Sequence, residues 1–97
     1  MAQTVSECLT AATDSVTVIN DINSKGKESK HIAASDPSAG VTQADANARV
    51  KENVDHLTII LAYDGTHDTP NVKDASDNKS SYTTAITTGN SYISSNS

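Results

Sequence analysis

The side chains best suited to chemistry are three histidines, one cysteine and twelve acids scattered along the chain. A metal site needs three or four such ligands to converge, and the nearest approach in sequence is Asp64, His67 and Asp68. Their spacing fits none of the usual metal-ligand patterns, and acids in such places more often cap turns. The segment around Asp74 lacks the alternating oxygen ligands and closing Glu of a calcium loop. We therefore predict no metal and no cofactor.

Nucleophiles give no stronger signal. Cys8 is the one cysteine, so the chain holds no internal disulfide, and beside Leu9 it is expected to behave as a small apolar residue. The 13 serines show no local nucleophile–His–acid signature, and no glycine-rich phosphate loop follows a strand. We therefore predict a non-enzymatic protein with no catalytic residue.

The composition bounds the class of protein. Ser and Thr supply 25 of the 97 residues, Phe and Trp are absent, and Leu, Ile and Val number only 17. That apolar content lies near the level at which disorder becomes a serious alternative. A net charge of −5 argues against nucleic acid, which requires a basic footprint. The length fits one domain over residues 1–97, either marginally stable alone or completed by a partner; the composition favours the second.

Two narrow apolar stripes are the main surfaces that the chain could bury in a core or an interface. Both step by fours and threes, which is the spacing of one line along an α-helix. The first runs from Val5 to Ile19 and includes Ala12, and the second runs from Val50 to Leu61. The residues predicted to form the core or an interface are Val5, Leu9, Val16, Ile19, Val50, Val54, Leu57, Ile60 and Leu61.

Capping signals place two helices around these stripes. Thr4 with Glu7 predicts the start of a helix over about residues 4–23, and Thr42 with Asp45 that of a helix over about 43–63. Asp64-Gly65 then predicts the end of the second helix. We also expect Asp45 to pair with Arg49, four residues on. Ile59 beside Ile60 widens the apolar arc, and we predict the deepest burial there.

The remaining segments are polar. The loop over 24–41 is long for a compact domain, so we expect it to lie on a partner or carry function, with Ile32 to Ala34 as a docking segment. Residues 64–77 are rich in turn formers, with Val72 as the one sizeable apolar anchor. Residues 78–94 favour a third, weak helix capped by Asp77 or Ser80.

The last segment also leaves a strand open, because its Thr and Tyr residues favour strands. Gly89 is expected to weaken the middle of a helix there. The fold class that follows is mainly α: a small helical hairpin or three-helix arrangement with long polar loops, completed by oligomerisation.

The stretch Asn47 to Ile93 resembles small structural proteins of tailed bacteriophage particles, of the head-decoration, cement or fibre-attachment type. The residues behind the resemblance are Val50 to Leu57, Tyr63-Asp64-Gly65 and Tyr82 to Ile86. The resemblance implies an oligomeric virion component bound to a major capsid or tail protein. It implies no catalytic residues.

Two hypotheses of function follow. The first is a structural virion protein that buries its apolar stripes against neighbouring chains. The second is a small helical adaptor or regulator that folds on a cellular partner. The N-terminal residues lack a basic start and an apolar run, and the longest apolar run, Ile59 to Ala62, is far too short for a membrane span. We expect synthesis in the host cytoplasm and no membrane partner.

Overall fold

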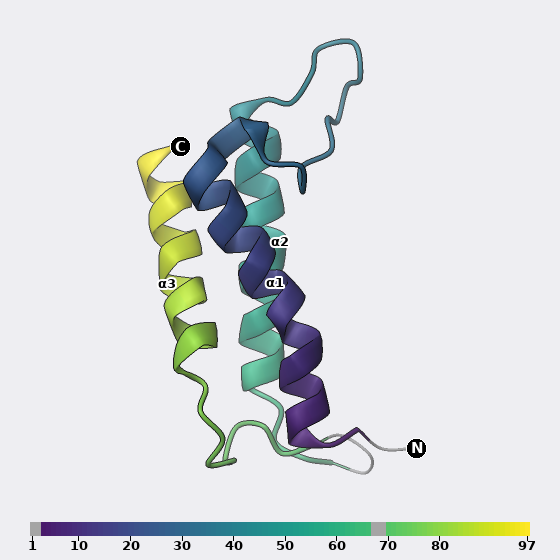
Figure 1. Ribbon diagram of the computed structural model, residues 1–97, viewed down its shortest axis with the longest axis vertical. Coiled ribbons are helices and arrows are strands. Elements are labelled where there is room, and N and C mark those ends of the chain that lie inside the picture. The colour runs from purple at the N-terminus through teal and green to yellow at the C-terminus, as the bar shows by residue number, and fades with distance from the viewer. Residues whose placement is uncertain (1–2, 67–69) are drawn as a thin grey trace.

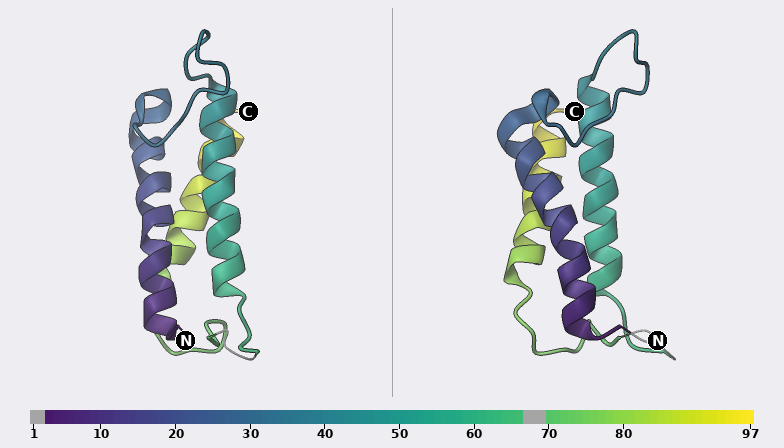
Figure 2. Two further views of the ribbon diagram at one scale, coloured as in Figure 1. Left: turned by 90° about the vertical axis from the view of Figure 1, so that its right-hand side faces the viewer. Right: turned by 45° about the vertical axis from the view of Figure 1, so that its right-hand side comes forward.

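Three α-helices packed side by side make up most of the described part of the chain (Figure 1). The computed structural model describes residues 3–66 and 70–97. Helix α1 spans Val5–Lys25, α2 spans Gln43–Leu61 and α3 spans Ser80–Ser95, and a single 3₁₀ turn, Gly26–Glu28, follows α1. Helices α1 and α3 run in the same direction and α2 runs the opposite way, with α3 lying behind the space between the other two (Figure 2). The prediction of a mainly α protein is confirmed, and the strand alternative for residues 78–94 is wrong.

Both predicted capping boxes are present. At α1 the hydroxyl of Thr4 accepts from the amide of Glu7 at 3.0 Å, and the Glu7 carboxylate accepts from the amide of Thr4 at 2.9 Å. At α2 the same reciprocal pair joins Thr42 and Asp45, at 3.2 Å and 3.0 Å. Each box satisfies two amides that a helix start otherwise leaves without partners.

The third helix begins without such a box. Its N-cap residue is Lys79, which makes no side-chain capping bond. The Asn78 side chain accepts from the amide and the hydroxyl of Ser80, at 3.0 Å and 2.8 Å. The prediction of Asp77 or Ser80 as the cap is therefore wrong, because the turn closed by Asn78 already occupies the first free amide.

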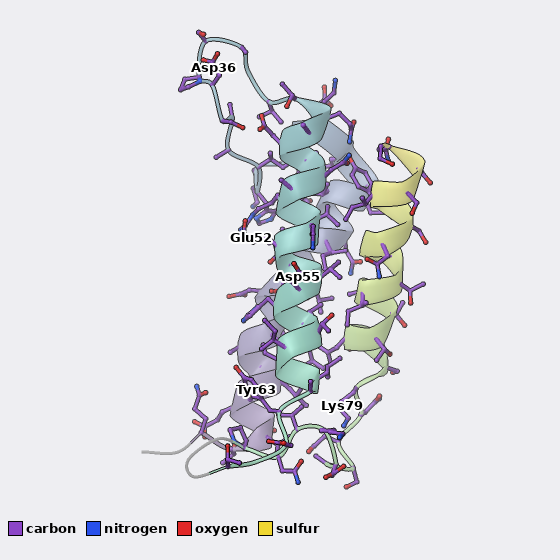
Figure 3. All side chains as sticks on the ribbon, turned by 180° about the vertical axis from the view of Figure 1, so that it is seen from behind. Asp36, Glu52, Asp55, Tyr63 and Lys79 are labelled. Atoms are coloured by element: carbon purple, nitrogen blue, oxygen red, sulfur yellow. The ribbon has the colours of Figure 1, made fainter. Side chains whose placement is uncertain are left out.

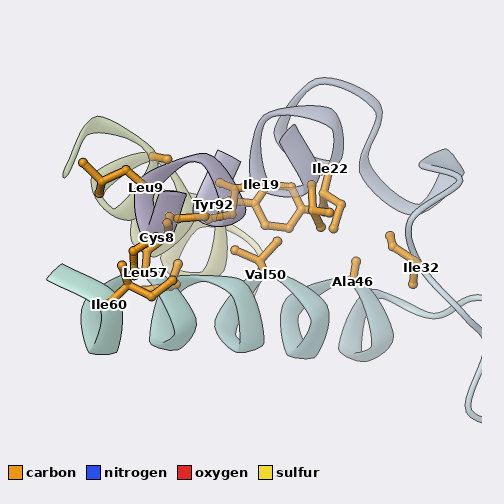
Figure 4. Close-up of a cluster of buried hydrophobic side chains, with 14 of the residues drawn as sticks. Cys8, Leu9, Ile19, Ile22, Ile32, Ala46, Val50, Leu57, Ile60 and Tyr92 are labelled. Carbon is orange, nitrogen blue, oxygen red and sulfur yellow. The ribbon is translucent and has the colours of Figure 1, made fainter. Parts of the chain in front are cut away.

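The core lies between the three helices (Figure 4). Of the nine residues predicted for it, six are buried: Leu9, Ile19, Val50, Val54, Leu57 and Ile60. The other three, Val5, Val16 and Leu61, are only half-buried and pack against its edge. The buried line of α1 runs instead through Cys8, Ala12, Ser15, Ile19 and Ile22. The line is rotated because α1 must face both α2 and α3.

The deepest burial lies in the middle of the bundle and at both its ends, not around Ile59. The largest side chains with almost no exposed surface are Ile19, Ile22, Leu57, Val50 and Val72. Ile59 is 57% exposed, so that prediction is wrong for it. It follows Leu57 by two residues, which turns it to the opposite side of α2, away from α1 and α3.

Helix α3 approaches α2 closely at Gly89. A Cβ atom on Gly89 would lie 2.4 Å from Cγ2 of Val54 and 3.1 Å from Cγ1 of Val50. The prediction that this glycine weakens α3 considered the helix alone. In the bundle its lack of a side chain is what lets the two helices pack.

The long loop after α1 docks on its own bundle. Ile32 is 9% exposed and belongs to the core. The Ser29 hydroxyl donates to Asp21 at 2.6 Å, and Arg49 Nε donates to the carbonyl of His31 at 3.0 Å. The ion-pair partner of Arg49 is Glu52 at 3.0 Å, so the predicted Asp45–Arg49 pair is wrong.

The second connection closes the other end of the bundle. Helix α2 ends at Leu61, with Ala62 as the cap residue, and Gly65 takes a left-handed φ of 76° three residues later. Val72 is fully buried, as an apolar anchor should be. The ammonium of Lys79 donates to the carbonyls of Val72 and Lys73 at 2.6 Å and 3.1 Å, at the foot of α3 (Figure 3).

No described helix is both long enough and apolar enough to cross a membrane.

Candidate interaction surface

The centres of the two predicted stripes are not free to bind another chain. Their central residues face one another inside the bundle: Ile19 and Leu57 have no exposed surface, and Val54 has 5%. A binding surface must therefore lie elsewhere, on the outside of the helices.

One face of the described bundle is formed by uncharged side chains of α1 and α3, and Glu7 borders it beside Ser6 and Thr10. We call it the charge-free face. On α1 it is a line of small polar residues with one aliphatic neighbour. On α3 the face consists of hydroxyl and amide side chains interspersed with half-buried apolar ones. Its members are Ser6, Thr10, Thr13, Val16, Thr17 and Asn20 from α1 and Tyr82, Thr83, Ile86, Thr87, Asn90 and Ile93 from α3.

Contacts of Tyr82 show that the two lines meet at the first turn of α3. The Tyr82 hydroxyl donates to the carbonyl of Leu9 at 2.9 Å and lies 3.4 Å from the hydroxyl of Thr13. The line of α1 that holds Thr13 thus borders α3. In Figure 1, α1 lies in front of α2 and α3 lies beside both, and the left view of Figure 2 shows α3 slanting from the side of α1 at its lower end toward α2 at its upper end.

The charged residues lie on other surfaces. Helix α3 has no Asp, Glu, Lys, Arg or His among its 16 residues. On α1 the acids Glu7, Asp14 and Asp21 recur every seven residues, which keeps them on one line of the helix beside the line of Thr10 and Thr17. Helix α2 carries several charges, and Glu52 and Asp55 lie on its outer side, seen from behind (Figure 3).

The threonines of the charge-free face turn their hydroxyls to their own backbone. Thr10, Thr13 and Thr17 donate to the carbonyls four residues before them at 2.9, 3.2 and 3.2 Å, and Thr87 does the same at 3.2 Å. Thr83 donates to the carbonyl of Ser80 at 3.0 Å. These donors are satisfied within the helix, so covering them costs less than covering a hydroxyl bonded to water.

A second candidate site is an open hollow of about 400 Å³ between the long loop and α2. Its polar groups are bonded to each other, since Arg49 joins both His31 and Glu52. Asp45 there accepts from Ser35 and from the amide of Thr42, and these hydrogen bonds lower the pKa of its carboxyl group. The residues that line the hollow therefore hold the loop against α2.

One serine and one histidine lie in bonding contact. Ser15 Oγ is 2.8 Å from His56 Nδ1 and links α1 to α2. Ser15 is only 3% exposed and lies inside a helix, where the backbone amides are used by the helix itself. No amide near it is free to stabilise an oxyanion, so the pair acts as a tie between helices.

The cysteine and the possible metal ligands also give no site for chemistry among the described residues. Cys8 is buried in the core, and burial raises the pKa of its thiol, which disfavours the reactive thiolate. Among residues 3–66 and 70–97, no three His, Cys, Asp or Glu side chains come close enough to hold a metal ion. The set Asp64, His67 and Asp68 lies partly outside the described residues.

The α1 part of the charge-free face could have been recognised from the spacing of its polar residues. Ser6, Thr10, Thr13, Thr17 and Asn20 step by fours and threes, just as the apolar stripes do. Attention to apolar residues alone misses a stripe of this kind, because small polar residues read as ordinary solvated surface.

Comparison of the chain with known protein families, with curated proteins and with solved structures found no match. The function is therefore inferred from the surface chemistry and from the resemblance in residues 47–93.

Proposed function

We propose that this protein is a non-enzymatic structural component of a phage particle, a cement, decoration or attachment protein bound to a capsid or tail protein. The observation that carries the binding role is the charge-free face, which extends along both α1 and α3. The phage setting comes from the resemblance of Asn47 to Ile93 to small virion proteins.

The charge-free face has the chemistry of an interface. The centres of protein–protein interfaces are depleted in charged residues and enriched in aromatic ones, and this face combines Tyr82 with the half-buried Val16, Ile86 and Ile93. Stable attachment typically buries about 1,200–2,000 Å² in total. The mechanism differs from the one predicted from sequence, because the outer surface of the folded bundle binds while the centres of its apolar stripes stay inside, with Val16 at their edge.

Mass spectrometry of purified particles tests the proposal. We expect the chain to stay with the particles through density-gradient purification and to be present in a fixed ratio to the major capsid or tail protein. Its absence from particles, together with its recovery bound to one host protein, would sink the proposal and favour the adaptor hypothesis.

A second measurement locates the attachment. Particles lacking the chain are mixed with purified wild-type protein or with Asn90→Lys, which adds a charge at an exposed position on the charge-free face. We expect the wild type to rebind and the variant to rebind at least about tenfold more weakly, because an unpaired buried charge is costly. Thr58→Lys, on exposed α2 surface, serves as the control that should rebind normally.

A further inference from the structure

We propose that two copies of this chain pair through the outer sides of their α2 helices, which pack antiparallel about a two-fold axis. This side of α2 faces away from α1 and α3, so the charge-free face stays open to a capsid or tail protein in each copy. The inference goes beyond the proposed function and does not depend on it. Pairing through one surface that is its own complement is the commonest form of homo-oligomer.

The outer side of α2 carries a line of residues that we call the outer stripe. Its steps are four, three, four, four and three residues, as along one line of an α-helix. All its members are exposed in the single bundle, and Figure 3 labels Asp55 on this side. Among the described residues, Ile59 is the one large apolar side chain that stays exposed. The members of the outer stripe are Ala44, Ala48, Lys51, Asp55, Ile59 and Ala62.

The outer stripe matches itself when a second copy is turned end to end. With the two-fold axis midway between Lys51 and Asp55, Lys51 of each copy lies opposite Asp55 of the other. The same axis sets Ile59 opposite Ala48 to within about one residue, and the alanines at the two ends of the stripe face each other. Opposite charges thus meet in the middle, and a large side chain meets a small one toward each end.

Charge and size both favour the antiparallel arrangement over a parallel one. In a parallel pair each residue would meet its own copy, so Lys51 would face Lys51 and Asp55 would face Asp55, which is repulsive. Ile59 would also meet Ile59, while the facing alanines would leave space between the helices unfilled. The order of residues along the stripe therefore sets the direction of the second copy.

The ion pairs of α2 can join across the axis. Lys51 and Asp55 form an ion pair within the helix at 2.9 Å, with side chains that are 68% and 56% exposed. In the antiparallel dimer each ion gains a second opposite charge, so two separate pairs become one network, and networks contribute more than isolated surface pairs. Glu52, on the flank of the stripe, is paired with Arg49 at 3.0 Å. The middle of the interface is therefore balanced in charge, although each copy carries a net charge of −5.

The apolar ends of the stripe supply surface that a second copy can cover. Ile59 loses contact with water when it lies against Ala48 of the other chain. Short side chains let helices approach closely, as the fully buried Ala12 and Ala46 do inside the bundle. Ala48 also lines the hollow beside the long loop, but it remains exposed, so the loop leaves this part of the stripe accessible.

The size of the contact predicts a weak dimer. A helix of 19 residues is about 28 Å long and about 10 Å wide. The contact therefore covers about 300 Å² in projection, well below the roughly 800 Å² that each partner buries in a standard interface. We expect a reversible dimer with a Kd on the order of 100 µM, so the chain is monomeric at the roughly 10 µM of a circular dichroism melt.

Sedimentation equilibrium of the full chain from about 10 µM to about 1 mM tests the dimer. The wild type should pass from monomer to dimer over this range. Asp55→Lys and Lys51→Asp should each weaken the dimer at least about tenfold, because like charges then face each other across the axis. An equal mixture of these two variants should dimerise again, since both charges of one variant then face opposite charges on the other.

Asp14→Lys is the matched control. It makes the same change of charge as Asp55→Lys at an exposed position on α1, and it should dimerise at least as well as the wild type. Both variants reduce the net negative charge equally, so loss of the dimer in Asp55→Lys alone comes from the outer stripe. Circular dichroism melts at about 10 µM check that each variant folds as a monomer.

A second control separates the two surfaces. Asn90→Lys, on the charge-free face, should rebind particles weakly and still dimerise as the wild type does. Retention on particles tests the proposed function and sedimentation tests the dimer, so the failure of one is distinguishable from the failure of the other.

Four results would overturn the inference. They are a wild type that stays monomeric at about 1 mM, an Asp55→Lys chain that dimerises as Asp14→Lys does, a mixture of the two charge variants that associates no better than either alone, and loss of the dimer in Asn90→Lys.

Discussion

At the scale of single residues, Gly89 shows how a position that weakens a helix can hold a bundle together. In an isolated helix, glycine costs about 1 kcal/mol relative to alanine. In this bundle the missing Cβ lets α3 lie against Val54 and Val50, the nearer of which a Cβ would approach to 2.4 Å. The close approach brings Ala85 and Tyr92, at 2% and 8% exposure, into the core on the same side of α3.

We predict that Gly89→Ala destabilises the protein by about 1–3 kcal/mol, because the added methyl group overpacks the contact with Val54 and this outweighs the gain in helix propensity. Urea denaturation measures the effect. In a Val54→Ala background the same substitution should cost less, since the nearest methyl group, Cγ2 of Val54, is gone, so the two changes are coupled. A stabilised Gly89→Ala protein would show that the helices separate easily at this point.

The residues of the core show what periodicity predicts and what it leaves open. The stripe on α2 was placed correctly through Val50, Val54 and Leu57, since one dominant apolar line leaves a single choice. On α1 the choice between the line of Val16 and that of Ile22 depends on where two neighbouring helices lie. That information is not local, so the sequence predicted the helix but not its rotation.

At the scale of elements, the helix starts were predictable because all their partners lie within four residues. Thr4 with Glu7 and Thr42 with Asp45 form their boxes without help from the rest of the fold. The role of Asp45 in the long loop was not predictable, because Ser35 returns to it from ten residues away. One carboxylate thereby caps α2 and holds the loop.

We predict that Asp45→Asn lowers the melting temperature at pH 7 and makes stability less sensitive to acid. Hydrogen bonds from Ser35 and Thr42 lower the pKa of the Asp45 carboxyl in the folded state. A carboxyl with a lowered pKa stabilises the fold at pH values above its unfolded pKa, near 3.9, and this contribution is lost as the pH falls through the folded value.

Thermal melts from pH 7 to pH 2 check the pH dependence. The gap between wild type and Asp45→Asn should be widest near neutral pH and should close toward pH 2. Asp14→Asn removes the same charge from an exposed position on α1 and controls for the change in net charge. A gap that stays constant over this range would contradict the assignment.

The third helix could be only partly predicted. Its threonines and tyrosines favour strands in isolation, yet Ala85, Gly89 and Tyr92 recur at helical spacing and are buried together. Tertiary contacts decide between the two structures here. The hydroxyls of Tyr82 and Tyr92 reach α1 and α2, with bonds of 2.9 Å to the Leu9 carbonyl and 2.9 Å from Gln43.

At the scale of the whole molecule, the chain covers its apolar stripes by itself, although only 17 of its 97 residues are Leu, Ile or Val. That count overlooked the small residues Ala12 and Ala46, which have no exposed surface and let the helices approach. It also overlooked the loops, whose anchors Ile32 and Val72 are buried in the core. Composition alone does not show that so few apolar residues can fill a core, because that depends on which side chains contact one another in the fold.

The last prediction separates the inside of the bundle from its outside. Leu57 has no exposed surface and Ile59, two residues along the same helix, is 57% exposed. Leu57→Asp places an unpaired charge in the core at a cost of several kcal/mol. A domain of this size has a total stability of about 5–15 kcal/mol, so we expect Leu57→Asp to lose most of its helical circular dichroism at room temperature.

Ile59→Asp is the matched control, because it makes a comparable change on the same helix at a position in water. It should melt within a few degrees of the wild type, as exposed substitutions change stability by only about 0.5 kcal/mol. Equal damage from both substitutions would mean that a neighbouring chain covers the outer side of α2. Tolerance of both would mean that the stripe through Leu57 does not hold the bundle together, and that the helices meet along another line.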